Sequence, residues 1–253
     1  MKWYLPDIFV LKVMHKRKWI GIMLFVMIHT SVIAQNTAKL DNLMWYSFIS
    51  VVSHKKWYWQ AEVHERHLLE PIIQHQFVAR YALYKELGHN FAICAGVTYL
   101  AHNTFKNDIL QGVFPHAEIE HREKVNNLSI TYNYRLELRF FDDNNILNVP
   151  PQKSFYYHNV RFRCKVLLSH PVFRIDENRK VHFRIFDELH LNMLSKFPNN
   201  GFNHNRLYTG LSINTTKSLT TNVGFMYWLQ QSGNQIFTHR KIYWIGFTHR
   251  LAK

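Results

Sequence analysis

Glycine, proline and cysteine are all scarce in this chain, and these shortages exclude several classes of protein. Nine glycines among 253 residues provide no glycine-rich loop for binding phosphate. Two cysteines, Cys94 and Cys164, exclude a disulfide framework and a cysteine-rich zinc site, and we expect two separate free thiols. Aromatic residues, by contrast, make up 15% of the chain. This balance favours a protein built from many strands.

Long apolar runs and helical periods are missing after residue 34. The stretch Trp19–Ile28 is apolar, but it is shorter than the roughly twenty residues that a membrane-spanning helix requires. Basic residues precede it and Ala34 follows it, which is the pattern of a secretory signal peptide. We therefore predict a leader over 1–34, with Met14 as an alternative start, and a single domain over 35–253.

Negative charge is also in short supply, since 31 Lys and Arg outnumber 17 Asp and Glu. Without residues 1–34, which carry five Lys or Arg and one Asp, the formal net charge falls from +14 to +10. The cations are spread through the chain, and an exported protein rarely meets nucleic acid, so we expect no nucleic-acid partner. The anionic partners that we expect are outer-membrane lipids or the phosphates of lipopolysaccharide.

The segment 128–141 alternates polar and apolar side chains. Its polar members are Ser129, Thr131, Asn133, Arg135, Glu137 and Arg139, and the apolar ones between them are Ile130, Tyr132, Tyr134, Leu136, Leu138 and Phe140. Successive side chains of a strand point to opposite faces, so this strand has one apolar and one charged face. If the apolar face meets a core, the sheet belongs to a soluble protein. If it meets lipid, the charged face lines the inside of a barrel.

Strand-like segments follow one another to the end of the chain. They span residues 43–53, 57–68, 73–86, 90–102, 113–125, 128–141, 155–169, 180–194, 204–215, 219–230 and 240–251. These segments are longer than the roughly five or six residues typical of strands in soluble proteins. They match the roughly nine to eleven or more residues that a tilted strand uses to cross a bilayer.

The connections between these strands support the same fold. Short connections such as 87–89 and 126–127 alternate with long ones such as 103–112 and 142–154, as in outer-membrane barrels. We therefore predict an all-β fold, an antiparallel up-and-down transmembrane β-barrel of about 10 to 12 strands, in the outer membrane of a Gram-negative bacterium. Single-chain bacterial barrels have even strand counts, so we expect either a short extra strand within 35–42 or one segment outside the barrel.

The sequence also resembles a known family, on soft strand patterns that cover roughly residues 42–251. These patterns are Asn42–Trp45, Lys56–Arg66, Ala92–Tyr99, Glu118–Arg122, Tyr134–Phe140 and Tyr243–Leu251, after a leader that ends Ser31-Val-Ile-Ala34-Gln35. The family is the domain-of-unknown-function family 2490, predicted outer-membrane β-barrel proteins of Bacteroidetes-type bacteria. The resemblance implies a barrel, but it implies no activity and transfers no functional residue.

Charged side chains on the predicted inner faces are the candidate site. They are Glu118, Glu120, Arg122, Arg135, Glu137, Arg139, Arg161, Arg163, Lys165, Arg184 and Glu188. Because so few strands enclose a narrow interior, we favour a lumen filled by paired charges over a narrow channel for a small anionic solute. The long connections 103–112 and 142–154 are the other expected place for binding.

Signatures of catalysis are largely absent. Barrel enzymes that cleave lipids place a histidine beside a serine, often as His-x-Ser, and the only such motif here is His29-Thr-Ser31 in the leader. His64 and His67 would face opposite sides of one strand, so they are poor joint metal ligands. We therefore assign no reaction, cofactor or metal, and keep two alternatives: an outer-membrane lipid-modifying enzyme and a soluble secreted β-barrel that binds a ligand.

Overall fold

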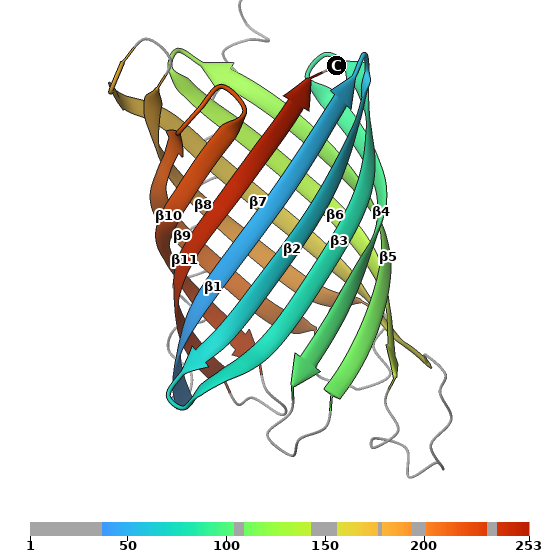
Figure 1. The fold of residues 1–253 in the computed structure, drawn as a ribbon. Coiled ribbons are helices and arrows are strands. Elements are labelled where there is room, and N and C mark those ends of the chain that lie inside the picture. Colours follow the sequence, from blue (N-terminus) through green and yellow to red (C-terminus); the bar gives the residue numbers. More distant parts are fainter. Residues whose placement is uncertain are drawn as a thin grey trace, which may run out of the picture. The chain divides into compact units, whose positions relative to one another are not determined.

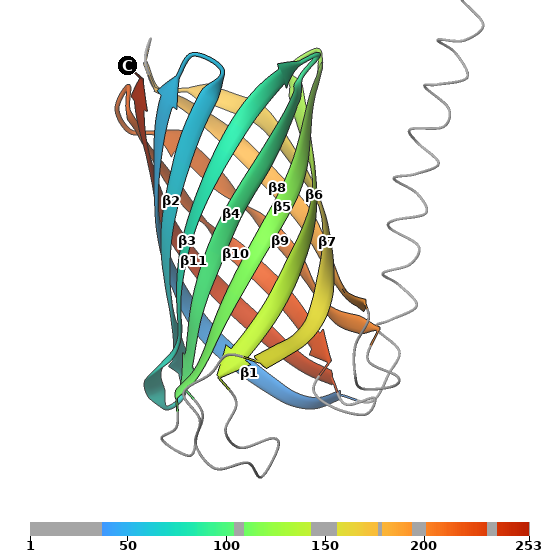
Figure 2. The same ribbon diagram turned by 90° about the vertical axis from the view of Figure 1, so that its right-hand side faces the viewer.

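The structure is a computed structural model that describes residues 37–103, 109–142, 156–176, 179–193, 201–231 and 237–252. Eleven strands form one closed barrel (Figures 1 and 2). They are β1 (Thr37–His54), β2 (Trp57–Leu69), β3 (Ile72–Gly88), β4 (Phe91–Asn103), β5 (Ile109–Val125), β6 (Leu128–Asp142), β7 (Tyr156–Arg174), β8 (Lys180–Met193), β9 (Phe202–Asn214), β10 (Leu219–Gln231) and β11 (Phe237–Ala252). The predicted all-β barrel is confirmed, whereas the expected leader lies outside the described residues.

Strand β6 follows the alternation that its sequence predicts. The barrel interior buries the polar side chains of Asn133, Arg135 and Glu137. The alternate residues Leu136 and Leu138 point outward and are 50% and 45% exposed. The two-residue period of a strand produces this separation. In β6 the charged face lines the lumen and the apolar face forms the outer surface.

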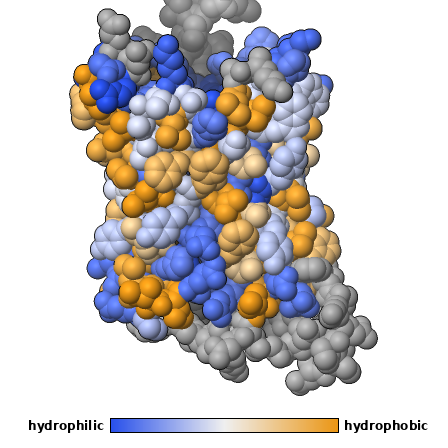
Figure 3. Space-filling view, in the orientation of Figure 1, coloured by the Kyte–Doolittle hydropathy of each residue, from blue (hydrophilic) through white to orange (hydrophobic). Residues whose placement is uncertain are grey.

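Buried charges and exposed apolar side chains also occur on other strands, beside a buried apolar cluster that includes Leu43 and Met226. Buried side chains include charged ones such as Glu62, Arg66 and Glu188, whereas large apolar side chains such as Phe48 and Tyr81 are exposed. Apolar side chains are spread over the face that Figure 3 shows, interrupted by a hydrophilic patch in its lower half. A polar interior and an apolar exterior are the reverse of a soluble protein.

Tight turns join the strands at one end of the barrel, called here the turn end. Lys55–Lys56, His89–Asn90 and Asn126–Asn127 connect β1 to β2, β3 to β4 and β5 to β6. Lys55, His89, Asn90 and Asn126 have positive φ angles of 53°, 48°, 64° and 54°, as tight hairpin turns require. At the opposite end, called the far end, β6 and β7 are separated by residues 143–155.

The barrel closes between its first and last strands, β1 and β11. The other ten pairings are antiparallel, but the arrowheads of β1 and β11 point to the same end in Figure 1. The residue numbers of the contacting side chains increase along both strands: Asp41 contacts Arg240, and further on Ser47 contacts Trp244. The two strands therefore run in the same direction. An odd number of alternating strands closes only through one parallel pair.

The parallel pairing of β1 and β11 explains how a barrel with an odd number of strands can close. Neither expected solution is correct, because residues 37–42 extend β1 and all eleven segments belong to the barrel. Two prolines lie within strands. Pro115 lies inside β5 and Pro171 inside β7, where the register with β8 shifts between Pro171 and Phe173. A proline lacks the amide hydrogen that the ladder needs, and an irregularity accommodates this loss.

The two cysteines are free thiols, as expected. They lie on β4 and β7, which are not neighbouring strands. Among the described residues, no helix is long and apolar enough to cross a membrane.

Candidate functional site

Two cavities occupy the lumen of the barrel. The larger has a volume of about 510 Å³ and reaches the turn end, where Arg122 and Arg250 of its lining are exposed. The smaller has a volume of about 120 Å³ and lies toward the far end, where Arg139 and Gln230 contribute to its lining. The two cavities therefore follow one another along the axis of the barrel and share part of their lining.

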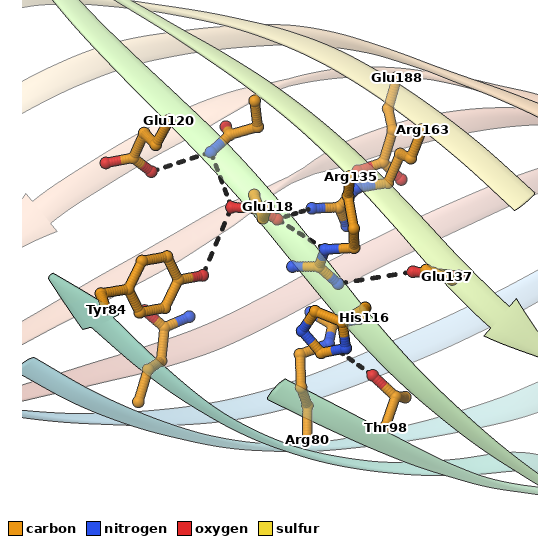
Figure 4. A network of polar contacts seen from close by, with 12 residues as sticks. Arg80, Tyr84, Thr98, His116, Glu118, Glu120, Arg135, Glu137, Arg163 and Glu188 are labelled. Carbon is orange, nitrogen blue, oxygen red and sulfur yellow. Dashed lines mark hydrogen bonds and ion pairs between the residues drawn. The ribbon is translucent and has the colours of Figure 1, made fainter. Parts of the chain in front are cut away.

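Glu118, on β5, is the centre of a buried network of ion pairs (Figure 4). Its Oε2 accepts hydrogen bonds from Arg135 Nε at 2.6 Å and from Arg163 Nη2 at 2.9 Å. Its Oε1 accepts one from Asn133 Nδ2 at 3.0 Å. The side chains of Glu118 and Arg135 are each 2% exposed, so water does not screen this pair.

Glu188, on β8, is the second centre of the network. Arg163 Nη1 lies 3.4 Å from Glu188 Oε2, and Arg206 Nη1 donates to Glu188 Oε1 at 3.0 Å. His190 Nε2 lies 2.7 Å from the same Oε1. Arg163 therefore bridges the carboxylates of Glu118 and Glu188 and connects β5 with β8 through the lumen.

Two further carboxylates complete the network. Glu137 forms an ion pair with Arg161 on β7, and its Oε1 lies 3.6 Å from Arg135 Nη1. Glu62 on β2 accepts a hydrogen bond from Arg80 Nη1 at 2.8 Å. Buried carboxylates are thus each paired with an arginine of a neighbouring strand, which is the condition for keeping charges inside a barrel.

Four arginines line both cavities and so lie between them; we call them the arginine layer. They are Arg66, Arg80, Arg163 and Arg206. Arg66 differs from the others because, among the described residues, no carboxylate lies within ion-pair distance of it. Its guanidinium carbon lies 3.8 Å from the ring centroid of Trp45, and its Nη1 donates to Gln76 Oε1 at 2.5 Å. The aromatic ring provides the electrostatic partner that a carboxylate provides elsewhere.

All eleven charged residues predicted from the sequence line one of the two cavities. Arg163 lines both cavities, and three residues line only the smaller one: Glu137, Arg139 and Arg161. The other seven line only the larger cavity: Glu118, Glu120, Arg122, Arg135, Lys165, Arg184 and Glu188. The structure brings six of these residues together in the network around Glu118 and Glu188. Arg122 lies apart from it at the turn end, where its Nη2 contacts Glu120 at 2.5 Å.

Sequence reasoning missed the wall formed by β2, β3 and β9. Glu62, Arg66, Arg80 and Arg206 all line the larger cavity. The signal was present in β2, where Gln60, Glu62, His64 and Arg66 recur at every second position. Glu65 and the neighbouring His67 obscured it, because they place a polar pair on the outer face, 3.0 Å apart.

Histidines in the lumen form hydrogen bonds with the buried carboxylates. His64 is buried and its Nε2 lies 2.8 Å from Glu62 Oε2, while Trp45 Nε1 donates to its Nδ1 at 3.1 Å. His64 and His67 do face opposite sides, as the sequence indicates. In the part of the chain that the structure describes, no group of three or more His, Cys, Asp and Glu side chains is placed to hold a metal ion.

A family match classifies the chain. The model of a family described as "Protein of unknown function (DUF2490)" matches residues 42–238. The chain belongs to the DUF2490 family. The resemblance suggested by the strand patterns is therefore confirmed. The description of DUF2490 names no activity, so it assigns no role to the residues that line the two cavities.

A solved structure also resembles this DUF2490 barrel. It is the crystal structure of the beta domain of the Bordetella autotransporter BrkA, with 11% sequence identity and a TM-score of 0.41. The similarity covers 76% of this chain and 82% of that chain. A comparison with curated proteins finds no match. We therefore infer the function of this DUF2490 barrel from its own residues.

Proposed function

We propose that the protein is an outer-membrane barrel that admits a small anionic solute into its larger cavity and does not form an open pore. The reversed polarity of the barrel supports the membrane location. Glu118, Arg135 and Glu137 are no more than 3% exposed inside, while Leu136 is 50% exposed outside. In water, such an exterior would be an aggregation hazard, whereas in a bilayer it is solvated by lipid. Membrane lipids or lipopolysaccharide are the partners we propose for the outer face.

The excess of positive charge in the cavities carries the proposal of an anionic solute. Nine Arg and Lys side chains line the larger cavity against four Glu, and six Arg line the smaller against one Glu. Low-dielectric walls lined by one sign of charge focus the field and concentrate ions of the opposite sign. A lumen that served only to pair its own charges would need about as many carboxylates as cations.

The arginine layer argues for a binding barrel in preference to a channel. Arg80, Arg163 and Arg206 are fixed by ion pairs to Glu62, Glu118 and Glu188, so they cannot move aside without breaking buried contacts. Arg66 is held between two indole rings, with 3.8 Å to the centroid of Trp45 and 5.5 Å to that of Trp228. An anion that enters from the turn end therefore meets a closed layer before the smaller cavity.

Quenching of Trp244 tests whether anions enter the larger cavity, which this residue lines. The barrel would be placed in nanodiscs of neutral lipid, and the fluorescence lost in Trp244→Phe would give the contribution of this residue. We expect iodide to quench that contribution several-fold more strongly than caesium, because the cavity attracts anions. Equal quenching by the two ions would contradict an anion-binding cavity.

Conductance in a planar bilayer tests the closed layer. Heat-modifiable gel mobility first shows that the sample is a folded barrel. We expect the folded protein to show almost no chloride conductance, because the arginine layer separates the cavities, and Arg66→Ala to raise it. A large, steady chloride conductance of the unmodified barrel would show instead that the lumen is an open channel.

A further inference from the structure

The larger cavity has one wall that charge pairing does not explain. Trp45, Phe186, Met226 and Trp244 line it on this side and come from β1, β8, β10 and β11. The opposite side carries the network around Glu118. A solute that is only an ion needs no aromatic wall, so this wall narrows the chemistry of the solute.

The rings of this aromatic wall contact one another in a continuous row. The rings of Phe186 and Tyr208 stack with centroids 4.8 Å apart, and Tyr208 meets Trp244 edge to face at 4.9 Å. Gly224 makes this possible, because a Cβ there would lie 2.5 Å from Tyr208 Cε2. The ring of Trp244 also packs against the ring of Trp45, with their centroids 5.8 Å apart. These contacts hold the rings in place before any ligand arrives.

The polar atoms of the two indoles are already occupied. Trp244 Nε1 donates to Ser47 Oγ at 2.7 Å, and Trp45 Nε1 donates to His64 Nδ1 at 3.1 Å. Neither N–H group is therefore available to a ligand. Trp244 offers its ring surface to the cavity, whereas the Trp45 ring already packs against Arg66. A flat apolar group is the complement of such a surface.

Two cations flank this wall without a carboxylate partner. Lys165 Nζ lies 4.3 Å from the ring centroid of Phe186, and Arg184 Nη1 donates to Asn222 Oδ1 at 3.0 Å. Lys165 is opposite Glu188 in the register, yet Glu188 is engaged by Arg163, Arg206 and His190. Among the described residues, no carboxylate lies within ion-pair distance of Lys165 or Arg184.

Register places the two cations on either side of Phe186. Lys165 pairs with Glu188, two residues after Phe186, while Arg184 lies two residues before it on the same face of β8. Lys165 thus contacts the ring of Phe186, and Arg184 is the next residue on the lumen face of β8. The volume of about 510 Å³ lies within the range of small-molecule pockets.

We propose that the larger cavity binds an organic anion that has a flat aromatic body and a carboxylate. The body lies against Phe186 and Trp244, and the carboxylate takes the place of the missing acidic partner of Lys165 and Arg184. This inference rests on the proposed function, since it names the class of anion that the cavity admits. Binding gains from both the ring surface and the charge, and neither alone suffices.

Equilibrium dialysis against the full barrel in neutral-lipid nanodiscs tests this site, with empty nanodiscs as the blank. The probe is naphthoate, compared with naphthalenemethanol, which has the ring without the charge, and acetate, which has the charge without the ring. We expect naphthoate to bind at least about tenfold more tightly than either. Naphthoate binding no tighter than acetate or naphthalenemethanol would overturn the inference.

Variants locate the site within the chain. Lys165→Gln combined with Arg184→Gln is expected to weaken naphthoate binding about tenfold or more, while Phe186→Leu weakens naphthoate and leaves the iodide quenching of Trp244 in place. The matched control is Lys124→Gln with Lys217→Gln, which removes two exposed cations outside the cavity lining. Unchanged binding in a double variant that keeps heat-modifiable mobility would contradict the assignment.

The two proposals fail in different ways. If iodide quenches Trp244 preferentially but naphthoate does not exceed acetate, the cavity takes simple anions and the aromatic wall is only structural. If iodide shows no preference over caesium, the cavity does not attract anions and both proposals fall.

Discussion

At the scale of single residues, Glu118 is the carboxylate that holds Arg135 and Arg163 in buried ion pairs. Its two oxygens receive hydrogen bonds from Arg135, Arg163 and Asn133. Such an ion pair contributes little net stability when complete, because desolvation offsets attraction. Removal of only one partner is costly, however, because the other charge then stays unpaired in a poorly solvated interior.

Glu118→Gln is therefore expected to lower the free energy of unfolding by about 3–5 kcal/mol. Urea unfolding in phospholipid vesicles, followed by tryptophan fluorescence, measures this change. The control is Asp176→Asn at the turn end, which breaks an ion pair to Arg179 whose side chains are 44% and 48% exposed. It is expected to cost less than about 1 kcal/mol. Equal losses in the two variants would show that the network does not behave as a buried one.

At the scale of elements, the seam between β1 and β11 sets this barrel apart from barrels with even strand counts. Side chains reinforce it on the inner face, where Arg240 Nε donates to Asp41 Oδ2 at 3.3 Å and Trp244 Nε1 to Ser47 Oγ at 2.7 Å. Closure removes the free edges that an open sheet would expose to lipid. If lipid surrounds the barrel, we therefore expect the seam to stabilise it.

A cysteine pair at Asp41 and Arg240 is expected to form a disulfide across the seam, in a background with Cys94→Ser and Cys164→Ser. The bond would close a loop of most of the chain and change the mobility of the denatured protein on a non-reducing gel. Cysteines at Ser53 and Arg240 are the control, because these positions lie at opposite ends of the parallel strands. A disulfide in the control alone would mean that β1 and β11 pair in another register or direction.

At the scale of the whole molecule, the reversed polarity separates a membrane barrel from the soluble alternative. Leu136 lies near the middle of β6 and is 50% exposed on the outer face. If lipid surrounds this face, a charge at Leu136 must enter the hydrocarbon. If water surrounds it, the same charge is harmless.

Leu136→Arg is therefore expected to destabilise the barrel in vesicles by about 2–4 kcal/mol, the cost of arginine at the bilayer midplane. Ile72→Arg serves as the control, because Ile72 begins β3 at the far end and is 80% exposed. Near the interface its cost falls to about 0–1 kcal/mol. Urea unfolding in vesicles measures both, and a neutral Leu136→Arg would support a soluble barrel.

The sequence by itself determined where the eleven strand segments lie and, for β5, β6, β7 and β8, which charged side chains face the lumen. The two-residue period is a local property, so Arg135 and Glu137 could be assigned to the inner face of β6 without knowledge of any other strand. It could not show that β1 and β11 close in parallel, because strand direction at the seam depends on the whole circuit of the barrel.

Only the tertiary structure decided which lumen charges meet and where space remains. Glu118 and Arg163 are 45 residues apart, and Ser47 and Trp244 are 197 apart, so their contacts follow from register and closure. Alternation assigns a side chain to a face but says nothing of its depth in the lumen. Depth decides that Lys165 and Arg184 border the aromatic wall while Arg163 joins the layer between the cavities. The chemistry of the site therefore arises from the closed barrel, although each strand already contains the residues.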